Sequence, residues 1–242
     1  MRIAVISDIH ANLHALEAVL AAIDAEGVDE LWCLGDLVGY GPRPSECVAL
    51  VRERASICLV GNHDLAVIGR IDLDLFVGEA GAAARWTTTV LDPGAAAYLG
   101  SLGPTASVEG VSLAHGSPRD PVWEYVLSPA TAQAALATSG EPLVLVGHSH
   151  VALAFASAEN GISGELAPAA TEVELRVGRH VLNPGSVGQP RDGDPRAAWL
   201  VIDTGSGRAT FCRTDYPIEL TQAEMRERGL PQALWERLAH GV

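Results

Sequence analysis

The sequence predicts an α/β protein in which two β-sheets pack against each other. Over the first 150 residues, short apolar segments rich in Val, Ile or Leu alternate with amphipathic segments, which is the pattern of buried strands joined by helices. After this point, strand-like segments follow one another through Gly, Pro, Asn and Asp turns. The chain has 242 residues, of which 48% are hydrophobic and 19% are charged, so it can bury a large core. We expect one domain over residues 1–242.

The first half contains five expected strands and four expected helices. The strands cover residues 2–7, 30–35, 56–60, 111–115 and 142–147. The helices cover residues 13–26, 44–54, 78–90 and 129–138. In the first helix, apolar side chains recur every three or four residues, and Asn12 is a suitable N-cap. This order predicts a mainly parallel sheet with right-handed crossovers.

The second half is expected to add a largely antiparallel sheet that packs on the first. Its strands cover residues 151–157, 170–177, 180–183, 197–203 and 208–213. Residues 157–170 are small and polar, which predicts a mobile hairpin tip. The C-terminal residues 221–240 have the spacing of one or two short helices, interrupted near Gly229 and Pro231.

Composition and charge exclude several classes of protein. The formal net charge is −14, so the surface repels phosphate backbones and long nucleic acid is a poor partner. No apolar run reaches the roughly 20 residues needed to cross a bilayer, so we expect no membrane segment. The sequence opens directly on a strand-like run without a signal-peptide pattern, from which we expect a cytoplasmic protein. The sequence has no heptad repeat and no long apolar stripe, so it does not indicate an oligomeric state.

Five short motifs carry side chains that bind metals, and each follows a predicted strand. They are Asp8-Ile9-His10, Gly35-Asp36, Gly61-Asn62-His63-Asp64, His115 and Gly147-His148-Ser149-His150. The carboxyl ends of strands form the edge where ligands bind in α/β sheets. Imidazole mixed with carboxylate suits divalent Mn, Fe, Co, Ni or Zn. Two such ions side by side polarise phosphoryl groups and generate hydroxide near neutral pH.

The spacing inside these motifs favours shared metal sites. At a strand end, side chains that are two residues apart in the sequence point to the same side. Asp8 and His10 could therefore reach one metal, and His148 and His150 likewise share a face. The carboxylate of Asp36 has two oxygens and could bridge two metals about 3.5–4 Å apart.

The third and fourth motifs add a neutral ligand, a catalytic candidate and a further imidazole. The amide oxygen of Asn62 is a neutral ligand, and the preceding glycine allows a tight turn. His63 is expected to point toward the substrate, where it could donate a proton to the leaving oxygen or stabilise charge. His115 ends an apolar strand and is the further imidazole candidate.

With these motifs in place, the chain resembles the calcineurin-like metallophosphoesterases, in particular their small bacterial and archaeal phosphodiesterase-like members. The family pattern DxH, GD, GNH(D/E), H and GHxH is complete between residues 8 and 150. Residues 183–188 also resemble the family's NPGS turn near the site. The resemblance implies a four-layer αββα fold, which is a two-sheet β-sandwich flanked by helices.

The resemblance also implies a role for each matching residue. One metal would be held by Asp8, His10, Asp36 and His150. The other would be held by Asp36, Asn62, His115 and His148, with Asp36 bridging. His63 would act with Asp36 and Asn62 in catalysis, and hydroxide between the metals would attack phosphorus in line.

One departure from related families concerns the residues after Asp36. Protein phosphatases and symmetrical diadenosine-tetraphosphate hydrolases usually have a GDxxDRG run, whose second Asp supports the catalytic His and whose Arg contacts phosphate. Here these positions are Gly39 and Tyr40, which predicts a less firmly oriented His63. Tyr40 could stack on an aryl group or a base, and Arg191 could supply the phosphate contact. The five tryptophans are expected to be packing residues.

These observations favour a two-metal phosphoesterase that hydrolyses a small phosphodiester, or alternatively a phosphomonoester. A second hypothesis is a nucleotide or dinucleoside-polyphosphate hydrolase, because Tyr40 and the absence of a basic groove suit a small nucleotide as substrate. A third is a non-catalytic binding scaffold with the same fold, although such proteins typically lose a ligand or the catalytic His, and this chain keeps both.

Overall fold

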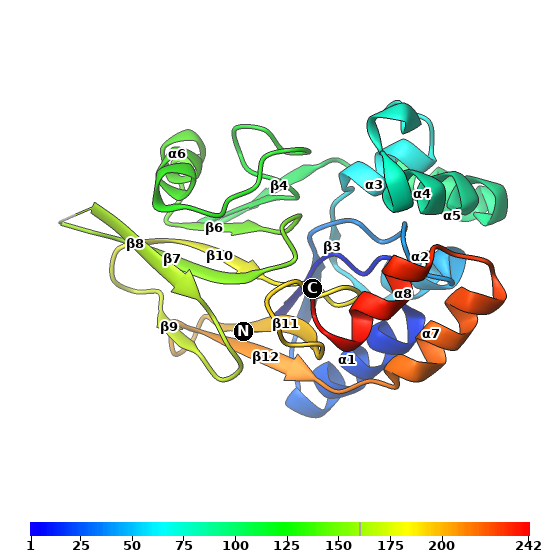
Figure 1. Ribbon diagram of the computed structural model, residues 1–242. Coiled ribbons are helices and arrows are strands. Elements are labelled where there is room, and N and C mark those ends of the chain that lie inside the picture. The colour runs from blue at the N-terminus through cyan, green and yellow to red at the C-terminus, as the bar shows by residue number, and fades with distance from the viewer. Residues whose placement is uncertain (160) are drawn as a thin grey trace.

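The computed structural model describes residues 1–159 and 161–242. Two six-stranded sheets pack face to face, with helices against the outer face of each (Figure 1). The layers therefore run helix, sheet, sheet, helix. This arrangement confirms the predicted α/β fold class, a two-sheet sandwich flanked by helices.

The strands divide evenly between two sheets, which we call sheet A and sheet B. Sheet A has the order β3-β2-β1-β11-β12-β9. Its strands are β1 (Arg2–Ile6), β2 (Glu30–Cys33), β3 (Ile57–Cys58), β9 (Glu172–Glu174), β11 (Ala197–Asp203) and β12 (Arg208–Thr214). Sheet B has the order β4-β5-β6-β10-β7-β8. Its strands are β4 (Thr105–Val108), β5 (Val111–Ala114), β6 (Leu143–Val146), β7 (Ala152–Ala158), β8 (Gly161–Leu166) and β10 (Arg179–Pro184).

Both sheets are mixed, and each takes strands from both halves of the chain. In sheet A, β1 pairs in parallel with β2 and antiparallel with β11. In sheet B, β6 pairs in parallel with both β5 and β10, and β10 pairs antiparallel with β7. The prediction that each half forms its own sheet is therefore wrong. Apolar composition identifies a strand buried on both faces, but it does not specify which strand becomes its neighbour.

Alternate residues of the central strands face different cores. In β1, Ile3 and Val5 lie between the two sheets, whereas Ala4 and Ile6 face the helices outside sheet A. Strand β6 divides its side chains in the same way between the inter-sheet core and helix α6 (Pro129–Ser139). The two-residue period of a strand explains how one apolar run serves two cores.

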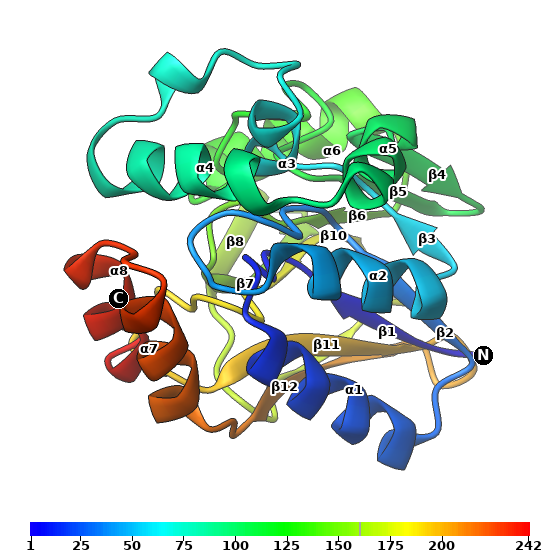
Figure 2. The same cartoon turned by 90° about the vertical axis from the view of Figure 1, so that its right-hand side faces the viewer.

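Helices α1 (Leu13–Glu26) and α2 (Pro44–Arg54) cover sheet A, and α6 covers sheet B. Asn12 caps α1 as predicted, since its side chain accepts the N–H of Ala15 at 3.2 Å. Figure 2 shows α7 beside α1. The other helices are α3 (Asn62–Val67), α4 (Gly78–Val90), α5 (Pro93–Ser101), α7 (Ile218–Glu227) and α8 (Gln232–Glu236), with 3-10 turns at Leu73–Leu75 and Arg237–Ala239.

Some elements differ from the sequence expectation. The sequence does not predict α3, α5 or β4. Helix α3 has only six residues and α5 is rich in Ala and Gly, so neither helix shows clear apolar periodicity. The proposed hairpin tip at 157–170 is largely strand, because β7 and β8 pair from Leu153 with Leu166 to Ala158 with Gly161. Small polar residues suit β8 because it is an exposed edge strand. Asn160, which the expected tip includes, lies outside the described residues.

The strand ends position the five motifs. Strands β1, β2 and β3 of sheet A, and β5 and β6 of sheet B, each end within a few residues of a motif. None of the helices within residues 1–159 and 161–242 combines the length and apolar character that crossing a membrane requires.

Replacement of Leu145 by Ala should destabilise the fold, because this side chain is fully buried between the sheets. We expect a loss of about 2–5 kcal/mol in the free energy of unfolding, measured by urea denaturation. Leu166→Ala on β8 is the matched control, since Leu166 is 55% exposed and should change stability by less than about 0.5 kcal/mol. Equal effects of the two substitutions would contradict this placement of the core.

Candidate metal centre

The five motifs converge at the edge of the sandwich where their strands end. Ligand atoms come within 4.8 Å of one another in three buried groups, which are Asp8, His10 and His150; His10, Asp36 and His63; and Asp36, His115 and His148. Asn62 joins the last group through its Oδ1 atom, 3.2 Å from His115 Nε2. The structure thus brings together all seven side chains predicted as ligands, together with the catalytic candidate His63.

Most of these ligands have an unusual backbone conformation. Asp8, His10, Asp36, His148 and His150 all have φ between 49° and 63°, the left-handed region that non-glycine residues rarely adopt. Each such residue costs about 1–3 kcal/mol, so the surrounding structure must hold it. The i, i+2 argument therefore placed Asp8 and His10 in one group for a wrong reason, and His148 and His150 lie in different groups. Asp8 and His10 share a side because of this left-handed turn and not because of strand alternation.

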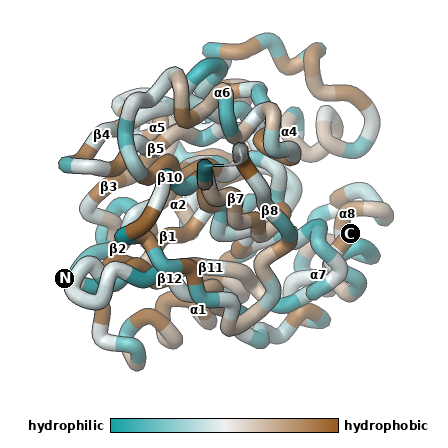
Figure 3. The backbone as a smooth tube through the Cα atoms, turned by 90° about the vertical axis from the view of Figure 1, so that its left-hand side faces the viewer, coloured by the Kyte–Doolittle hydropathy of each residue, from teal (hydrophilic) through white to brown (hydrophobic). Residues whose placement is uncertain are grey.

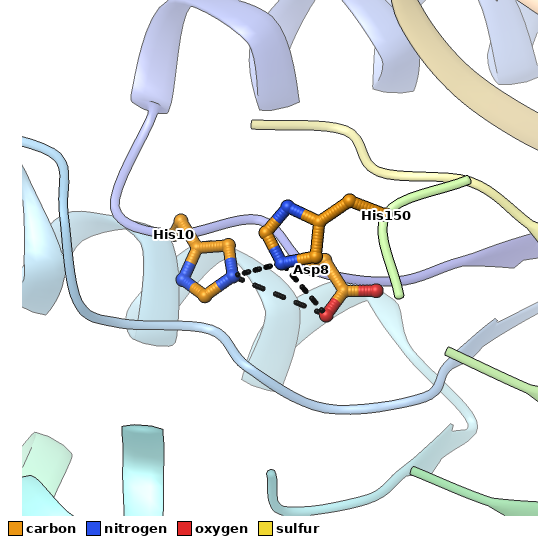
Figure 4. Close-up of side chains that lie close together, drawn as sticks. All are labelled: Asp8, His10 and His150. Carbon is orange, nitrogen blue, oxygen red and sulfur yellow. Dashed lines mark hydrogen bonds and ion pairs between the residues drawn. The ribbon is translucent and has the colours of Figure 1, made fainter. Parts of the chain in front are cut away.

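In the first group, the imidazoles of His10 and His150 face each other beside the carboxylate of Asp8 (Figure 4). His10 Nδ1 lies 3.0 Å from Val38 O, and His150 Nδ1 lies 2.7 Å from Gln189 O. Because a carbonyl only accepts, each Nδ1 carries the hydrogen and each Nε2 presents a lone pair. The two Nε2 atoms are nevertheless 2.9 Å apart, and lie 3.9 and 3.6 Å from Asp8 Oδ1. Burial lowers the pKa of both rings well below the usual range, so three acceptor atoms converge as around a cation.

The group of Asp36, His115 and His148 has a similar arrangement. His115 Nδ1 lies 2.9 Å from Leu34 O, which leaves its Nε2 3.2 Å from Asn62 Oδ1 and 3.4 Å from Asp36 Oδ2. Burial alone would lower the pKa of His115, but the Asp36 carboxylate outweighs it and raises the pKa to about 9. A proton or a metal ion at Nε2 would therefore satisfy these acceptors. Burial lowers the pKa of His148 to about 3, so this ring is a neutral donor of a lone pair.

The two carboxylates each use one oxygen for positioning. Asp8 Oδ2 accepts the backbone N–H of His148 at 3.0 Å, and Asp36 Oδ1 accepts that of His63 at 2.9 Å. Burial raises the pKa of Asp8 to about 7. Burial acts in the same direction at Asp36, but the neighbouring imidazoles of His115 and His63 outweigh it and hold the pKa well below its usual range.

The remaining carboxylate oxygens face the imidazoles. Asp8 Oδ1, Asp36 Oδ2 and His148 Nε2 are buried and have no hydrogen-bond partner in the part of the chain that the structure describes. Asp36 Oδ2 lies 3.7 Å from His10 Nε2 and 3.4 Å from His115 Nε2, between the two groups. Buried unpaired acceptors are unfavourable unless a cation compensates them. The donor set therefore fits divalent metal ions, with Asp36 placed to be shared.

His63, which belongs to the group with His10 and Asp36, also lines a cavity of about 360 Å³. Its ring packs against Tyr40 at 4.5 Å between centroids, and edge-on against Phe76 at 4.8 Å. Its Nδ1 atom is buried without a hydrogen-bond partner among the described residues. The absence of a supporting carboxylate follows from Gly39, where a Cβ would lie 2.6 Å from Nδ1. Asp64 does not replace that support, because its carboxylate accepts two backbone N–H groups.

Both predicted substrate residues lie at this cavity. Arg191 Nη2 donates to Tyr40 Oη at 3.3 Å and to Gln189 Oε1 at 2.9 Å. Both Tyr40 and Arg191 line the cavity with His63. Burial, aided by the Arg191 charge, lowers the pKa of His63 to about 4 against the opposing effect of Asp36. The imidazole of His63 is therefore neutral at pH 7.

The NPGS-like turn holds the metal-ligand loops in place. Asn183 Nδ2 donates to Gly147 O at 2.7 Å and to Ser149 Oγ at 3.0 Å, within the GHxH motif. Ser186 Oγ donates to Asp8 O at 2.7 Å. These polar contacts stabilise the left-handed ligand backbones, a supporting role that metal sites commonly require. The sequence located this turn near the site but did not assign these roles.

Three aromatic residues at the cavity were missed as site residues. Phe76, Trp123 and Tyr125 line it, and Tyr125 stacks on His148 with 4.2 Å between centroids and 4° between planes. The expectation that the tryptophans serve packing holds for four of them, which lie in or against the hydrophobic cores. It is wrong for Trp123, which is 40% exposed. The available signal was the presence of Trp and Tyr in the loop directly after a metal-ligand motif.

This fold has clear counterparts among known proteins. The metallophosphoesterase of Sphaerobacter thermophilus, a solved structure, superposes with a TM-score of 0.91 at 46% identity, covering 100% of this chain and 99% of that one. The architecture is thus that of a metallophosphoesterase sandwich. Residues 1–207 match the model of the calcineurin-like phosphoesterase superfamily domain. The chain belongs to this superfamily, whose members are phosphoesterases, and the resemblance of the motifs is confirmed.

Two further relatives differ in how much they share. The uncharacterized protein MJ0912 of Methanocaldococcus jannaschii is 37% identical over 246 residues, which cover 99% of this chain and 98% of that protein. The symmetrical bis(5'-nucleosyl)-tetraphosphatase of Thioalkalivibrio sulfidiphilus is 35% identical over 71 residues, or 28% of this chain and 26% of that protein. The relative that matches over its full length therefore has no named substrate. The relative whose name gives a substrate matches this chain over a short segment only.

Gly39→Ala should disturb His63 directly. Position 39 has φ +89°, and the added methyl group would meet the imidazole. We expect a loss of about 1–3 kcal/mol beyond the backbone strain, measured by urea denaturation. Gly69→Ala is the control, because Gly69 has φ +75° but no atom within 4 Å of the added Cβ, so only backbone strain of about 1–2 kcal/mol applies. Equal losses in both variants would show that position 39 does not constrain His63.

Proposed function

We propose that this chain is a two-metal hydrolase that acts on small phosphodiesters. The observation that supports it most is the Asp36 Oδ2 atom, which is buried, lacks a hydrogen-bond partner among the described residues and lies between His10 and His115. A carboxylate oxygen in this position is suited to be shared by two cations. We assign one ion to Asp8, His10, Asp36 and His150, and the other to Asp36, Asn62, His115 and His148.

Two bound divalent ions would polarise the phosphoryl oxygens and lower the pKa of water enough to supply a nucleophile near neutral pH. Mn, Fe, Co, Ni and Zn all suit this donor set. The chain's own residues would then orient the ester. His63, neutral and at the cavity wall, would hydrogen-bond a phosphoryl or leaving oxygen. Arg191 would contact a second oxygen, since guanidinium groups match phosphate geometry.

The lining of the cavity favours a diester over a monoester. Arg191 is the sole Lys or Arg among the described residues that line the cavity. A phosphomonoester carries nearly two negative charges at pH 7, whereas a diester carries one. Arg191 can contact one phosphate oxygen in either ester, but the apolar and aromatic part of the lining can receive the second substituent, which only a diester carries. The net charge of −14 also disfavours a long polyanionic substrate.

The first test is hydrolysis of an aryl phosphodiester and an aryl phosphomonoester by metal-stripped protein, before and after adding each candidate metal. We expect turnover only with metal, and faster turnover of the diester. Asp36→Asn should abolish turnover and reduce bound metal. His63→Ala should lower kcat by about 100-fold or more while bound metal stays unchanged.

The control for these variants is His14→Ala, because His14 lies outside the three ligand groups and its side chain is 22% exposed. Its rate should match that of the wild-type protein. Wild-type turnover by Asp36→Asn would rule out the shared-ligand role. No turnover with any metal, despite two bound ions per chain, would instead favour the non-catalytic scaffold.

A dinucleoside-polyphosphate hydrolase is the second candidate, supported by the local likeness to the symmetrical tetraphosphatase and by Tyr40 at the cavity. Gly39 and Tyr40 depart from the run typical of those enzymes, and the lining has one fixed cation to offset a polyphosphate. We therefore expect kcat/KM for diadenosine tetraphosphate to fall below that for an aryl phosphodiester. The reverse order, measured with the same metal, would favour the polyphosphate substrate.

A further inference from the structure

The cavity above the candidate metal centre has an aromatic and apolar mouth. Trp123 and Tyr125 are 40% and 47% exposed, and the neighbouring Leu75 and Val77 are 64% and 79% exposed. Exposed apolar side chains are ordinary when scattered, but a contiguous group around a concave site marks a surface that a ligand covers. These four side chains and the buried Phe76 all line the same cavity.

Two segments far apart in the sequence form this mouth. Leu75, Phe76 and Val77 lie between α3 and α4, in the segment that stands away from the body of the molecule in Figures 2 and 3 and contains hydrophobic stretches. Trp123 and Tyr125 lie in the loop between β5 and α6. The two segments meet where Phe76 packs against Trp123, with 5.7 Å between ring centroids.

The loop that carries Trp123 and Tyr125 is internally braced. Glu124 pairs with Arg119 and accepts the hydroxyl of Ser117. Asp120 Oδ1 accepts the backbone N–H of Trp123 at 3.1 Å. The indole is therefore presented by an ordered loop, so a ligand would lose little free energy in ordering it.

The aromatic mouth is continuous with the reaction site. Tyr125 stacks on the metal-ligand candidate His148, and Phe76 contacts His63 edge-on. A phosphoester with its phosphorus beside His63 must direct its substituents toward the mouth. A planar ring placed there would meet the faces or edges of Phe76, Trp123 and Tyr125, which are favourable partners for aromatic groups.

We propose that Phe76, Trp123 and Tyr125 form a subsite for a planar aromatic group, either an aryl ring or a nucleobase, on the substrate. The proposal rests on the proposed function and specifies its substrate class. A simple alkyl ester or a sugar phosphate would leave the rings of Trp123 and Tyr125 exposed to water. A polynucleotide is disfavoured by the net charge of −14, so the aromatic group belongs to a small molecule.

Binding to phosphonates tests the subsite without requiring turnover, because their C–P bonds resist hydrolysis. The affinities of phenylphosphonate and cyclohexylphosphonate for the Mn²⁺-loaded full-length protein should be compared by isothermal titration calorimetry. The two ligands have similar size and the same charge, and differ in aromaticity. We expect about tenfold tighter binding of the phenyl compound. The phosphonate analogue of adenosine 5'-monophosphate then distinguishes a nucleobase from a simple aryl ring by binding more tightly or more weakly than phenylphosphonate.

Two substitutions of one residue separate aromaticity from bulk. Trp123→Phe should keep most of the preference for phenylphosphonate, whereas Trp123→Leu should reduce it to about twofold or less. Leu127→Ala is the matched control, because Leu127 is 53% exposed on the same loop but does not line the cavity. Circular dichroism and bound-metal content establish that each variant is folded and loaded. Tyr125→Leu serves as a second probe if Trp123→Leu fails to fold.

Equal affinities of the wild-type protein for the phenyl and cyclohexyl compounds would overturn the proposal. A preference that survives both Trp123→Leu and Tyr125→Leu would overturn it as well. The outcome is independent of the hydrolase assay. Aromatic preference without turnover of any ester would leave the subsite standing and reject the proposed function, and turnover without aromatic preference would do the opposite.

Discussion

The structure depends on a cluster of buried acceptor atoms that have their lone pairs pointed at one another. His10 and His150 each donate their Nδ1–H to a backbone carbonyl. The two Nε2 lone pairs therefore point toward each other, with the Nε2 atoms 2.9 Å apart. Asp8 and Asp36 each accept a backbone N–H with one carboxylate oxygen and direct the other oxygen into the same space. In a water-filled site this arrangement would be unremarkable, but burial makes it unfavourable without a compensating positive charge. The tautomers, the carboxylate positions and the strand ends that carry them are all consistent with a cation in that space.

Holding these acceptors together requires strain, and the sandwich supplies the support. Five of the ligands adopt left-handed φ values, each unfavourable by about 1–3 kcal/mol. The ligands come from loops of both sheets, so the inter-sheet core fixes their relative positions. The end of β10 and the turn after it then hold the loops in place: Asn183 hydrogen-bonds the GHxH segment, and Ser186 hydrogen-bonds the Asp8 carbonyl. Rigid strands on two sides, and polar contacts at their ends, explain how a strained ligand set persists.

The sequence located the candidate ligands better than it predicted the architecture that brings them together. Asp8, Asp36 and His115 could be found because each has a chemically distinctive side chain directly after an apolar strand. The neighbours of those strands could not be found, since an apolar run such as that of β1 is equally compatible with pairing to β2 alone or, as observed, to β2 and β11. Trp123 was also misassigned, because its exposure depends on a loop conformation fixed by Asp120 and Glu124. The sequence therefore predicts which residues have metal-binding side chains. It does not predict the exposure of a side chain in a loop, because this depends on contacts that form only in the fold.

The replacement at Gly39 and Tyr40 links the candidate catalytic residue to the aromatic cavity. A carboxylate at position 39 would hydrogen-bond His63 Nδ1 and stabilise its protonated form. Here the position has no side chain, Nδ1 has no partner among the described residues, and burial keeps the ring neutral. Orientation comes instead from the rings of Tyr40 and Phe76 on the cavity side. Phe76 also contacts Trp123, so a ligand ring seated in the mouth would press on the same stack that positions His63. In this chain, the proposed recognition of the substituent and the orientation of the imidazole would therefore share one set of contacts.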